Sequence, residues 1–97
     1  MEEELSKRYP NRIRQIRLEK GLTQRELAHI LGYKSVSSLS HLERGRKLPS
    51  LQTALKLEQA LQRLMGDIYP RLYKQIQNSV GQRRARFFAK RGEKSSW

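Results

Sequence analysis

The segment from Thr23 to Gly45 constrains the fold of this chain more than any other part of the sequence. Thr23, followed three residues later by Glu26, forms a capping box, in which each side chain binds a backbone N–H left free at a helix start. The apolar residues that follow recur at helical spacing, at Leu27, Ala28 and Leu31. Gly32 can end this helix because glycine readily takes a positive φ. The pattern predicts a short helix between Thr23 and Gly32.

A second short helix is expected between Ser35 and Gly45. Ser35 or Ser37 can supply its N-cap. Leu39 and Leu42 lie three residues apart and therefore share one face. The opposite face is small, polar and basic, and consists of Val36, Ser37, Ser40, His41 and Arg44. The groove of a nucleic-acid duplex can accept a helix face of this kind.

These two helices with a tight turn between them resemble the helix-turn-helix of the Cro and phage-repressor type, the Xre family. The matching residues within the motif are Gln24, Glu26, Leu27, Ala28, Gly32, Ser40, Glu43, Arg44 and Gly45, and those beside it are Arg17, Lys20, Gly21, Leu22, Thr23, Pro49, Ser50 and Leu51. The resemblance covers residues 11–68. It implies an all-α, five-helix domain similar to the DNA-binding domain of lambda repressor. The segment from Gly32 to Gly45 is one residue longer than in the commonest family form, which shifts the base-facing positions by up to one residue.

The remaining helices follow from caps and apolar spacing. We expect a helix over residues 11–20 with Pro10 in its first turn, Ile13 and Ile16 inward, and Gly21 at its end. A further helix is expected over residues 51–65, capped by Ser50. Its broad apolar face comprises Leu51, Leu55, Leu57, Leu61 and Leu64. Gly66 and Asp67 are expected to break the chain before a last helix that begins at Pro70.

The chain is therefore expected to have four parts. Residues 1–9 form a flexible lead, residues 10–69 the helix-turn-helix domain, residues 70–91 a basic amphipathic helical extension, and residues 92–97 a disordered tail. Gly81 within the extension weakens the helix and is a candidate for a bend.

The charge of the chain favours a polyanionic partner. Lysine and arginine outnumber acidic residues 21 to 9, and the excess is largest after residue 65, where eight basic residues face two acidic ones. Nucleic acid is the simplest partner for such a surface, although a basic surface that serves only solubility is the alternative. The chain has no cysteine, which excludes disulfides and thiolate metal sites. No apolar run is long enough for a signal peptide or a membrane span.

Signals of an enzyme or a metal site are absent from the sequence. His29 and His41 stand twelve residues apart without a carboxylate or cysteine at ligand spacing. There is no glycine-rich phosphate loop and no nucleophile elbow. We therefore expect no catalytic residue, no metal and no cofactor. The resemblance implies a cytoplasmic protein of bacterial, phage or mobile-element origin.

The resemblance also assigns candidate roles to individual residues. Those expected on the DNA backbone are Gln24, Arg44, Arg46 and Lys47, and those expected to face bases are Lys34, Ser35, Val36, Ser37, Ser40 and His41. For the basic residues, an exposed loop without a DNA contact is the alternative. In the family, an arginine at the position of Arg17 pairs with the glutamate that matches Glu43. The alternative here is two separate solvated charges.

The extension is open to three interpretations. Leu72, Ile76, Val80 and Phe87 fall near one helix face, which can pack on the helix over residues 51–65 and on a second copy to form a homodimer. The arginine-rich end can instead be a flexible arm that grips phosphates, or the whole segment can be one long helix that completes the monomer core.

The sequence as a whole predicts a sequence-specific regulator of transcription that binds double-stranded DNA, most simply a repressor. A protein-interaction module, such as an antitoxin or adaptor that binds DNA secondarily, is the main alternative, and charge-driven compaction of nucleic acid is a third.

Overall fold

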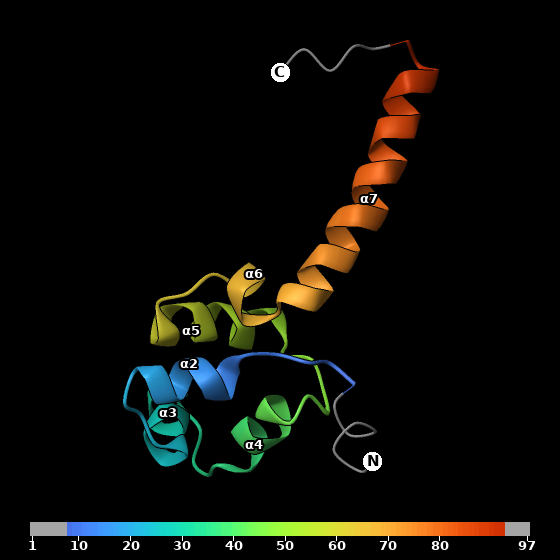
Figure 1. The fold of residues 1–97 in the computed structure, drawn as a ribbon. Coiled ribbons are helices and arrows are strands. Elements are labelled where there is room, and N and C mark those ends of the chain that lie inside the picture. Colours follow the sequence, from blue (N-terminus) through green and yellow to red (C-terminus); the bar gives the residue numbers. More distant parts are fainter. Residues whose placement is uncertain (1–7, 93–97) are drawn as a thin grey trace.

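A computed structural model describes residues 8–92, and this part of the chain contains helices and no strand (Figure 1). The helices are α2 (Ile13–Glu19), α3 (Gln24–Leu31), α4 (Ser37–Glu43), α5 (Leu51–Leu61), α6 (Met65–Ile68) and α7 (Pro70–Lys90). The expected all-α fold is confirmed. Most of the expected lead and tail falls on residues 1–7 and 93–97, outside the described range, but Tyr9, the last residue of the expected flexible lead, packs against the core and donates its backbone N–H to the Gly45 carbonyl oxygen at 2.8 Å.

The expected ends of α3 are present. The hydroxyl of Thr23 accepts a hydrogen bond from the Glu26 backbone N–H at 3.0 Å, and the Glu26 carboxylate accepts one from the Thr23 N–H at 2.9 Å. Gly32 closes the helix with φ 87° and Gly45 follows α4 with φ 70°, both in the left-handed region that glycine favours. The turn after α3 is therefore fixed by local chemistry.

The expected serine cap of α4 is wrong. Val36 precedes the helix with φ −85° and ψ −5°, and among the described residues no side chain caps this end. A capping side chain needs an extended backbone at its own residue, whereas Val36 already has helical angles. Ser37 is consequently the first residue of α4, and its side chain and that of Ser35 are exposed.

Helix α2 begins two residues later than expected. The carboxamide oxygen of Asn11 accepts a hydrogen bond from the Ile13 N–H at 3.0 Å, and its nitrogen donates to the Leu42 carbonyl oxygen at 2.8 Å. Pro10 thus precedes the helix instead of lying in its first turn. Asn11 satisfies the start of α2 and ties it to the end of α4.

The predicted helix over residues 51–65 is divided in the structure. Helix α5 ends at Leu61 because Gln62 takes a left-handed conformation with φ 55°, and Gly66 and Asp67 lie inside α6 instead of breaking the chain. The broad apolar face is wrong in part, since only two of its leucines are buried. The exposed ones are Leu51 at 76%, Leu55 at 54% and Leu64 at 70%. Leu51 and Leu55 lie roughly 120° and 160° around the helix from Leu57.

The core is drawn from every helix before α7. Its buried residues are Ile13, Ile16, Leu27, Ala28, Leu31, Leu39, Leu42, Leu57, Leu61, Ile68 and Tyr69. Helix α3 packs on α4 and α5, and α2 packs on α4. The backbone N–H of Arg12 donates to the Ile68 carbonyl oxygen at 2.8 Å, which joins the two ends of this bundle. The small side chain of Ala28 is 2% exposed, as expected where helices cross closely.

Helix α7 projects from the bundle. It leaves α6 on the side of the molecule opposite α3 and α4 and runs unbroken through Gly81 (Figure 1). None of its residues, all of which the structure describes, is buried, and Leu72 alone packs partly against the core. The radius of gyration is 17.0 Å, whereas a compact chain of this length has about 13 Å. The interpretation in which this helix completes the monomer core is therefore wrong beyond its first turn.

Replacing Tyr69 by phenylalanine is expected to leave the protein equally stable or slightly more stable. Within residues 8–92 its hydroxyl is a buried side-chain polar atom without a hydrogen-bond partner, and burial raises the pKa of Tyr69 to about 12. The unfolded chain loses this proton near pH 10, so the wild type should lose stability as the pH rises from 10 to 12. The variant should lose less over that range, which thermal unfolding at both pH values measures.

Candidate nucleic-acid interface

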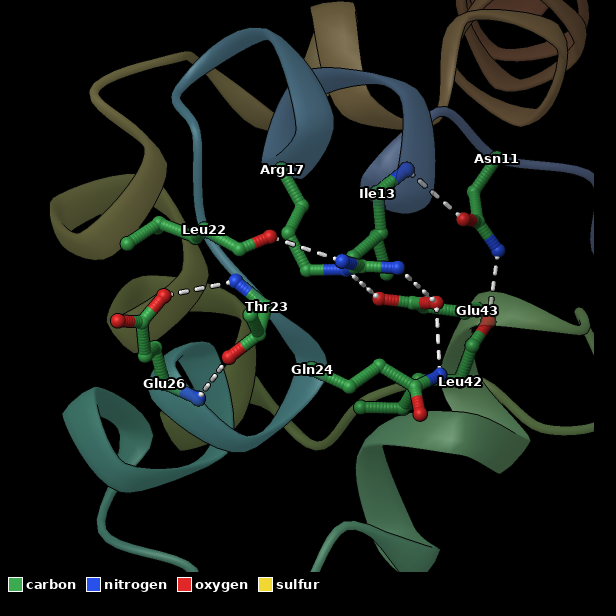
Figure 2. A network of polar contacts seen from close by, with 9 residues as sticks. All are labelled: Asn11, Ile13, Arg17, Leu22, Thr23, Gln24, Glu26, Leu42 and Glu43. Atoms are coloured by element: carbon green, nitrogen blue, oxygen red, sulfur yellow. Dashed lines mark hydrogen bonds and ion pairs between the residues drawn. The ribbon is translucent and has the colours of Figure 1, made fainter.

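A nearly buried carboxylate connects the two motif helices, α3 and α4, to α2 (Figure 2). Glu43, at the end of α4, lies 2.7 Å from the Nε of Arg17 on α2 and accepts a second hydrogen bond from the Arg17 Nη2 at 3.3 Å. The side chains of Arg17 and Glu43 are only 8% and 3% exposed. The pair implied by the resemblance is thus present, and it is not a pair of solvated charges.

Leu22 and Gln24 make further contacts with this ion pair. We call the group of Arg17, Leu22, Gln24 and Glu43 the Glu43 cluster. The Arg17 Nη1 donates to the Leu22 carbonyl oxygen at 2.9 Å, and the Gln24 amide nitrogen donates to the Glu43 Oε1 at 3.0 Å (Figure 2). The second of these contacts was not anticipated from the sequence. It fixes the start of α3 against the end of α4.

The outer surface of α4 and of the turn before it is polar and cationic. Lys34, Ser35, Val36, Ser37 and His41 are exposed, and Ser40 is half-buried. Leu39 and Leu42 on the other face are buried in the core, so they turn this surface toward solvent. From Leu27 to Leu57 the sequence contains a single carboxylate, Glu43. Because Glu43 is turned into its cluster, it does not offset the positive charge of the outer surface.

The basic residues expected to contact phosphates lie directly after α4. Arg44, Arg46 and Lys47 are all exposed. The Arg46 backbone N–H donates to the His41 carbonyl oxygen at 3.0 Å, and its guanidinium lies 3.5 Å from the His41 Nδ1. This loop is therefore folded back on the last turn of α4, which brings Arg46 and His41 together.

Two cations at the edges of the motif surface, Arg14 on α2 and Arg25 on α3, were missed from the sequence. Arg14 lines the same surface hollow as Gln24 and Arg44, and Arg25 lines a second hollow together with Lys34 and Val36. Both arginines are exposed. Arg25 directly follows Gln24, and Arg14 lies three residues before Arg17, so helical spacing could have placed both at the edges of the interface.

Comparison with known proteins gives the family of the chain. A family model described as "Helix-turn-helix", of the Xre and Cro type, matches residues 13–66, which is more than half of the 97 residues. The chain belongs to this helix-turn-helix family. A search of curated proteins and a search of solved structures returned no significant match. The match covers α2 to α5 and the start of α6, with α3 and α4 as the two motif helices.

The family match ends before α7, where the residues expected in a dimer or extension lie. Leu72 is half-buried at the root of the helix, whereas Ile76, Val80 and Phe87 are 53%, 54% and 54% exposed. Within one chain, therefore, α5 does not cover this face beyond Leu72. An apolar groove at the root of the helix is lined by Leu48, Leu51, Met65, Tyr73 and Ile76, among others.

Residues 8–92 hold no group of three histidine, cysteine, aspartate or glutamate side chains placed to bind a metal ion. In the same range, no helix combines the length and the apolar character needed to cross a membrane.

Proposed function

We propose that this protein is a sequence-specific regulator of transcription that binds double-stranded DNA through α4. The observation that carries this proposal is the surface from Lys34 to Lys47, which presents cations and hydroxyl groups while its one carboxylate is turned inward. Such a surface complements a phosphate backbone and fits the major groove. We further propose that the protein acts as a repressor, by occupying a promoter and blocking polymerase, whereas recruitment of polymerase from such a position would make it an activator.

The proposed contacts divide into positioning and reading. Arg44, Arg46 and Lys47 would bind phosphates on one side of the groove. Gln24 would bind a phosphate at the start of α3, because an amide nitrogen carries two hydrogens and Glu43 takes only one of them. The residues proposed to face bases are Lys34, Ser35, Val36, Ser37, Ser40 and His41.

These six residues offer few contacts that are specific for one base. Serine hydroxyls both donate and accept, so they discriminate weakly between bases. Val36 could contact a thymine methyl group, and His41 could bind a guanine or a phosphate. We infer that one half-site gives modest specificity, and that dimerisation and DNA shape supply the remainder.

We propose a homodimer in which two α7 helices pack in parallel. Tyr73, Ile76 and Val80 recur at the alternating three- and four-residue spacing of a coiled-coil seam and are exposed in one chain. Because α7 leaves the bundle opposite α4, a parallel pair keeps both α4 helices on one side, where they can reach one duplex (Figure 1). An antiparallel pair would place them at opposite ends. Arg83 occupies the next seam position, so repulsion should part the helices beyond Val80.

The same apolar surface favours a second candidate function. If the chain is a monomer in solution, the groove around Leu51 and Tyr73 and the face of α7 would be open to another protein. The protein would then act as an interaction module, such as an antitoxin or adaptor, with DNA binding as a secondary property. The oligomeric state separates the two candidates.

Selection of bound duplexes from a random library, at near-physiological salt, tests the proposed function. We expect an enriched palindrome with half-sites about one helical turn apart. Gln24→Ala should weaken binding to all duplexes alike, by roughly tenfold, because it removes a hydrogen bond to a phosphate. His41→Ala should change the enriched base at one position of each half-site.

Two results would contradict this proposal. Absence of any enriched sequence, with binding that collapses as salt rises, would leave only contacts to phosphates. An equal loss on every duplex for both variants would show that His41 does not read bases. Thermal unfolding of both variants serves as the control, because Gln24 also belongs to the Glu43 cluster.

A further inference from the structure

The last turns of α7 concentrate positive charge at the end of the molecule farthest from α4 (Figure 1). Between Asp67 and Glu93 the sequence has no carboxylate. The cations in this interval are Arg71, Lys74, Arg83, Arg84, Arg86, Lys90 and Arg91. The molecule is 53 Å long in its greatest dimension, so the end of α7 and the surface of α4 are two separate surfaces.

Phe87 is the centre of this charge. The four positions three and four residues away from it along the helix are Arg83, Arg84, Lys90 and Arg91. Residues at these spacings are neighbours on a helix surface, so four cations surround one aromatic ring. Phe87 is 54% exposed although it is large and apolar.

The ring contacts in this region are made with cations and with a second aromatic ring. The Arg91 guanidinium lies 5.4 Å from the centre of the Phe87 ring, and the Arg84 guanidinium lies 4.8 Å from that of Phe88. The two phenylalanine rings meet edge to face at 5.3 Å. These contacts hold the side chains close together without burying Phe87, so the fold of the bundle does not explain its presence.

An exposed aromatic ring within a ring of cations matches the chemistry of single-stranded nucleic acid. The cations can bind successive phosphates, and the ring offers a surface on which an unpaired base can stack. A duplex satisfies the first part alone, because its bases already stack on one another. We propose that the end of α7, centred on Phe87, binds a single strand of DNA or RNA, separately from the duplex site on α4.

The two sites can be occupied together in this arrangement. The α4 surface and the end of α7 lie on opposite sides of the bundle (Figure 1). The parallel dimer proposed above would part beyond Val80, which leaves Phe87 of each copy accessible. Binding at the end of α7 does not depend on whether α4 reads a specific sequence.

The test measures the binding of fluorescently labelled 20-nucleotide oligo(dT) and oligo(U) to the full chain by anisotropy. Arg84→Gln with Lys90→Gln should lower the affinity about tenfold and reduce the salt slope by about 1.4, which is 0.7 for each lost phosphate contact. Phe87→Leu should lower it by roughly 5- to 150-fold, since leucine keeps the apolar bulk and the helix but cannot stack.

Two control variants separate binding at the Phe87 site from the effect of net charge and from binding at α4. Arg71→Gln with Lys74→Gln removes the same two charges from the same helix, away from Phe87, and should leave the affinity nearly unchanged. Replacing Arg44, Arg46 and Lys47 by alanine should abolish binding to the selected duplex sequence but preserve single-strand binding, which separates this site from the proposed function. Circular dichroism verifies that each variant keeps its helix content.

The outcomes are distinct. Binding of either oligonucleotide that Phe87→Leu weakens supports the proposal. The oligonucleotide that binds more tightly is the preferred strand. Equal weakening by the Arg71 and Lys74 changes would reduce the effect to net charge and overturn the site. Unchanged binding by Phe87→Leu would overturn the stacking, and loss of single-strand binding in the alanine variant would assign the strand to α4 instead.

Discussion

Arg17→Ala should lower the free energy of unfolding by about 3–5 kcal/mol, which is the usual cost of removing one partner of a buried ion pair. Glu43, whose side chain is 3% exposed in the native structure, would keep only Gln24 as its partner, and the Leu22 carbonyl would lose its guanidinium donor. For a domain of this size, the midpoint of thermal unfolding should fall by about 12 °C or more. Because the free energy of unfolding of a protein is commonly about 5–15 kcal/mol, this substitution would remove a large part of it.

The chain offers a matched control for this experiment. Arg63 pairs with Glu19 at 3.2 Å, but their side chains are 34% and 42% exposed. Arg63→Ala should therefore cost less than about 1 kcal/mol. Replacing Arg17 by methionine and Glu43 by leucine together should recover much of the loss, because no charge then stays buried alone. Similar melting temperatures for Arg17→Ala and Arg63→Ala would contradict this account of the Glu43 cluster.

Ile76→Glu combined with Val80→Glu should convert the proposed dimer into a monomer. Four carboxylates would meet along the seam of a parallel α7 pair, where they are both desolvated and mutually repulsive. Loss of the second α4 should lower the affinity for a palindromic operator by about 10²–10⁴-fold, which is the usual gain from linking two binding modules. Sedimentation equilibrium and operator titration measure the two effects.

Gln75→Glu with Gln82→Glu is the control for the dimer experiment. It adds the same two negative charges to the same helix, but more than about 100° around it from the Ile76 and Val80 face. This variant should remain dimeric. A dimer that survives the Ile76 and Val80 changes would refute the α7 seam, whereas a monomeric wild type would favour the protein-interaction module.

The sequence predicted the motif well because local chemistry determines it. The Thr23 and Glu26 capping box, the left-handed glycines and the leucines at helical spacing each act within one or two turns. A pattern of this kind needs no knowledge of distant contacts. The family resemblance rests on these local features, and it covers nearly the same part of the chain as the family model, residues 13–66.

The predictions that failed depend on contacts between elements or on single backbone angles. Leu51 and Leu55 look like core residues in a leucine-rich segment, but the buried face of α5 is set by the position of α3. Asn11 joins α2 to a carbonyl 31 residues away, and Gln24 meets Glu43 across 19 residues. No spacing rule in the sequence indicates such pairs.

The Glu43 cluster also bears on how this protein can change through evolution. The cluster joins the end of α4 to α2 and to the start of α3, and none of the residues proposed to face bases takes part in it (Figure 2). If these residues read bases as proposed, substitutions at the exposed ones, Lys34, Ser35, Val36, Ser37 and His41, would alter the preferred DNA sequence while the fold keeps its stability, whereas Leu39 between them belongs to the core. A lineage could then acquire new target sites by altering one solvent-facing surface, with the residues that orient it left unchanged.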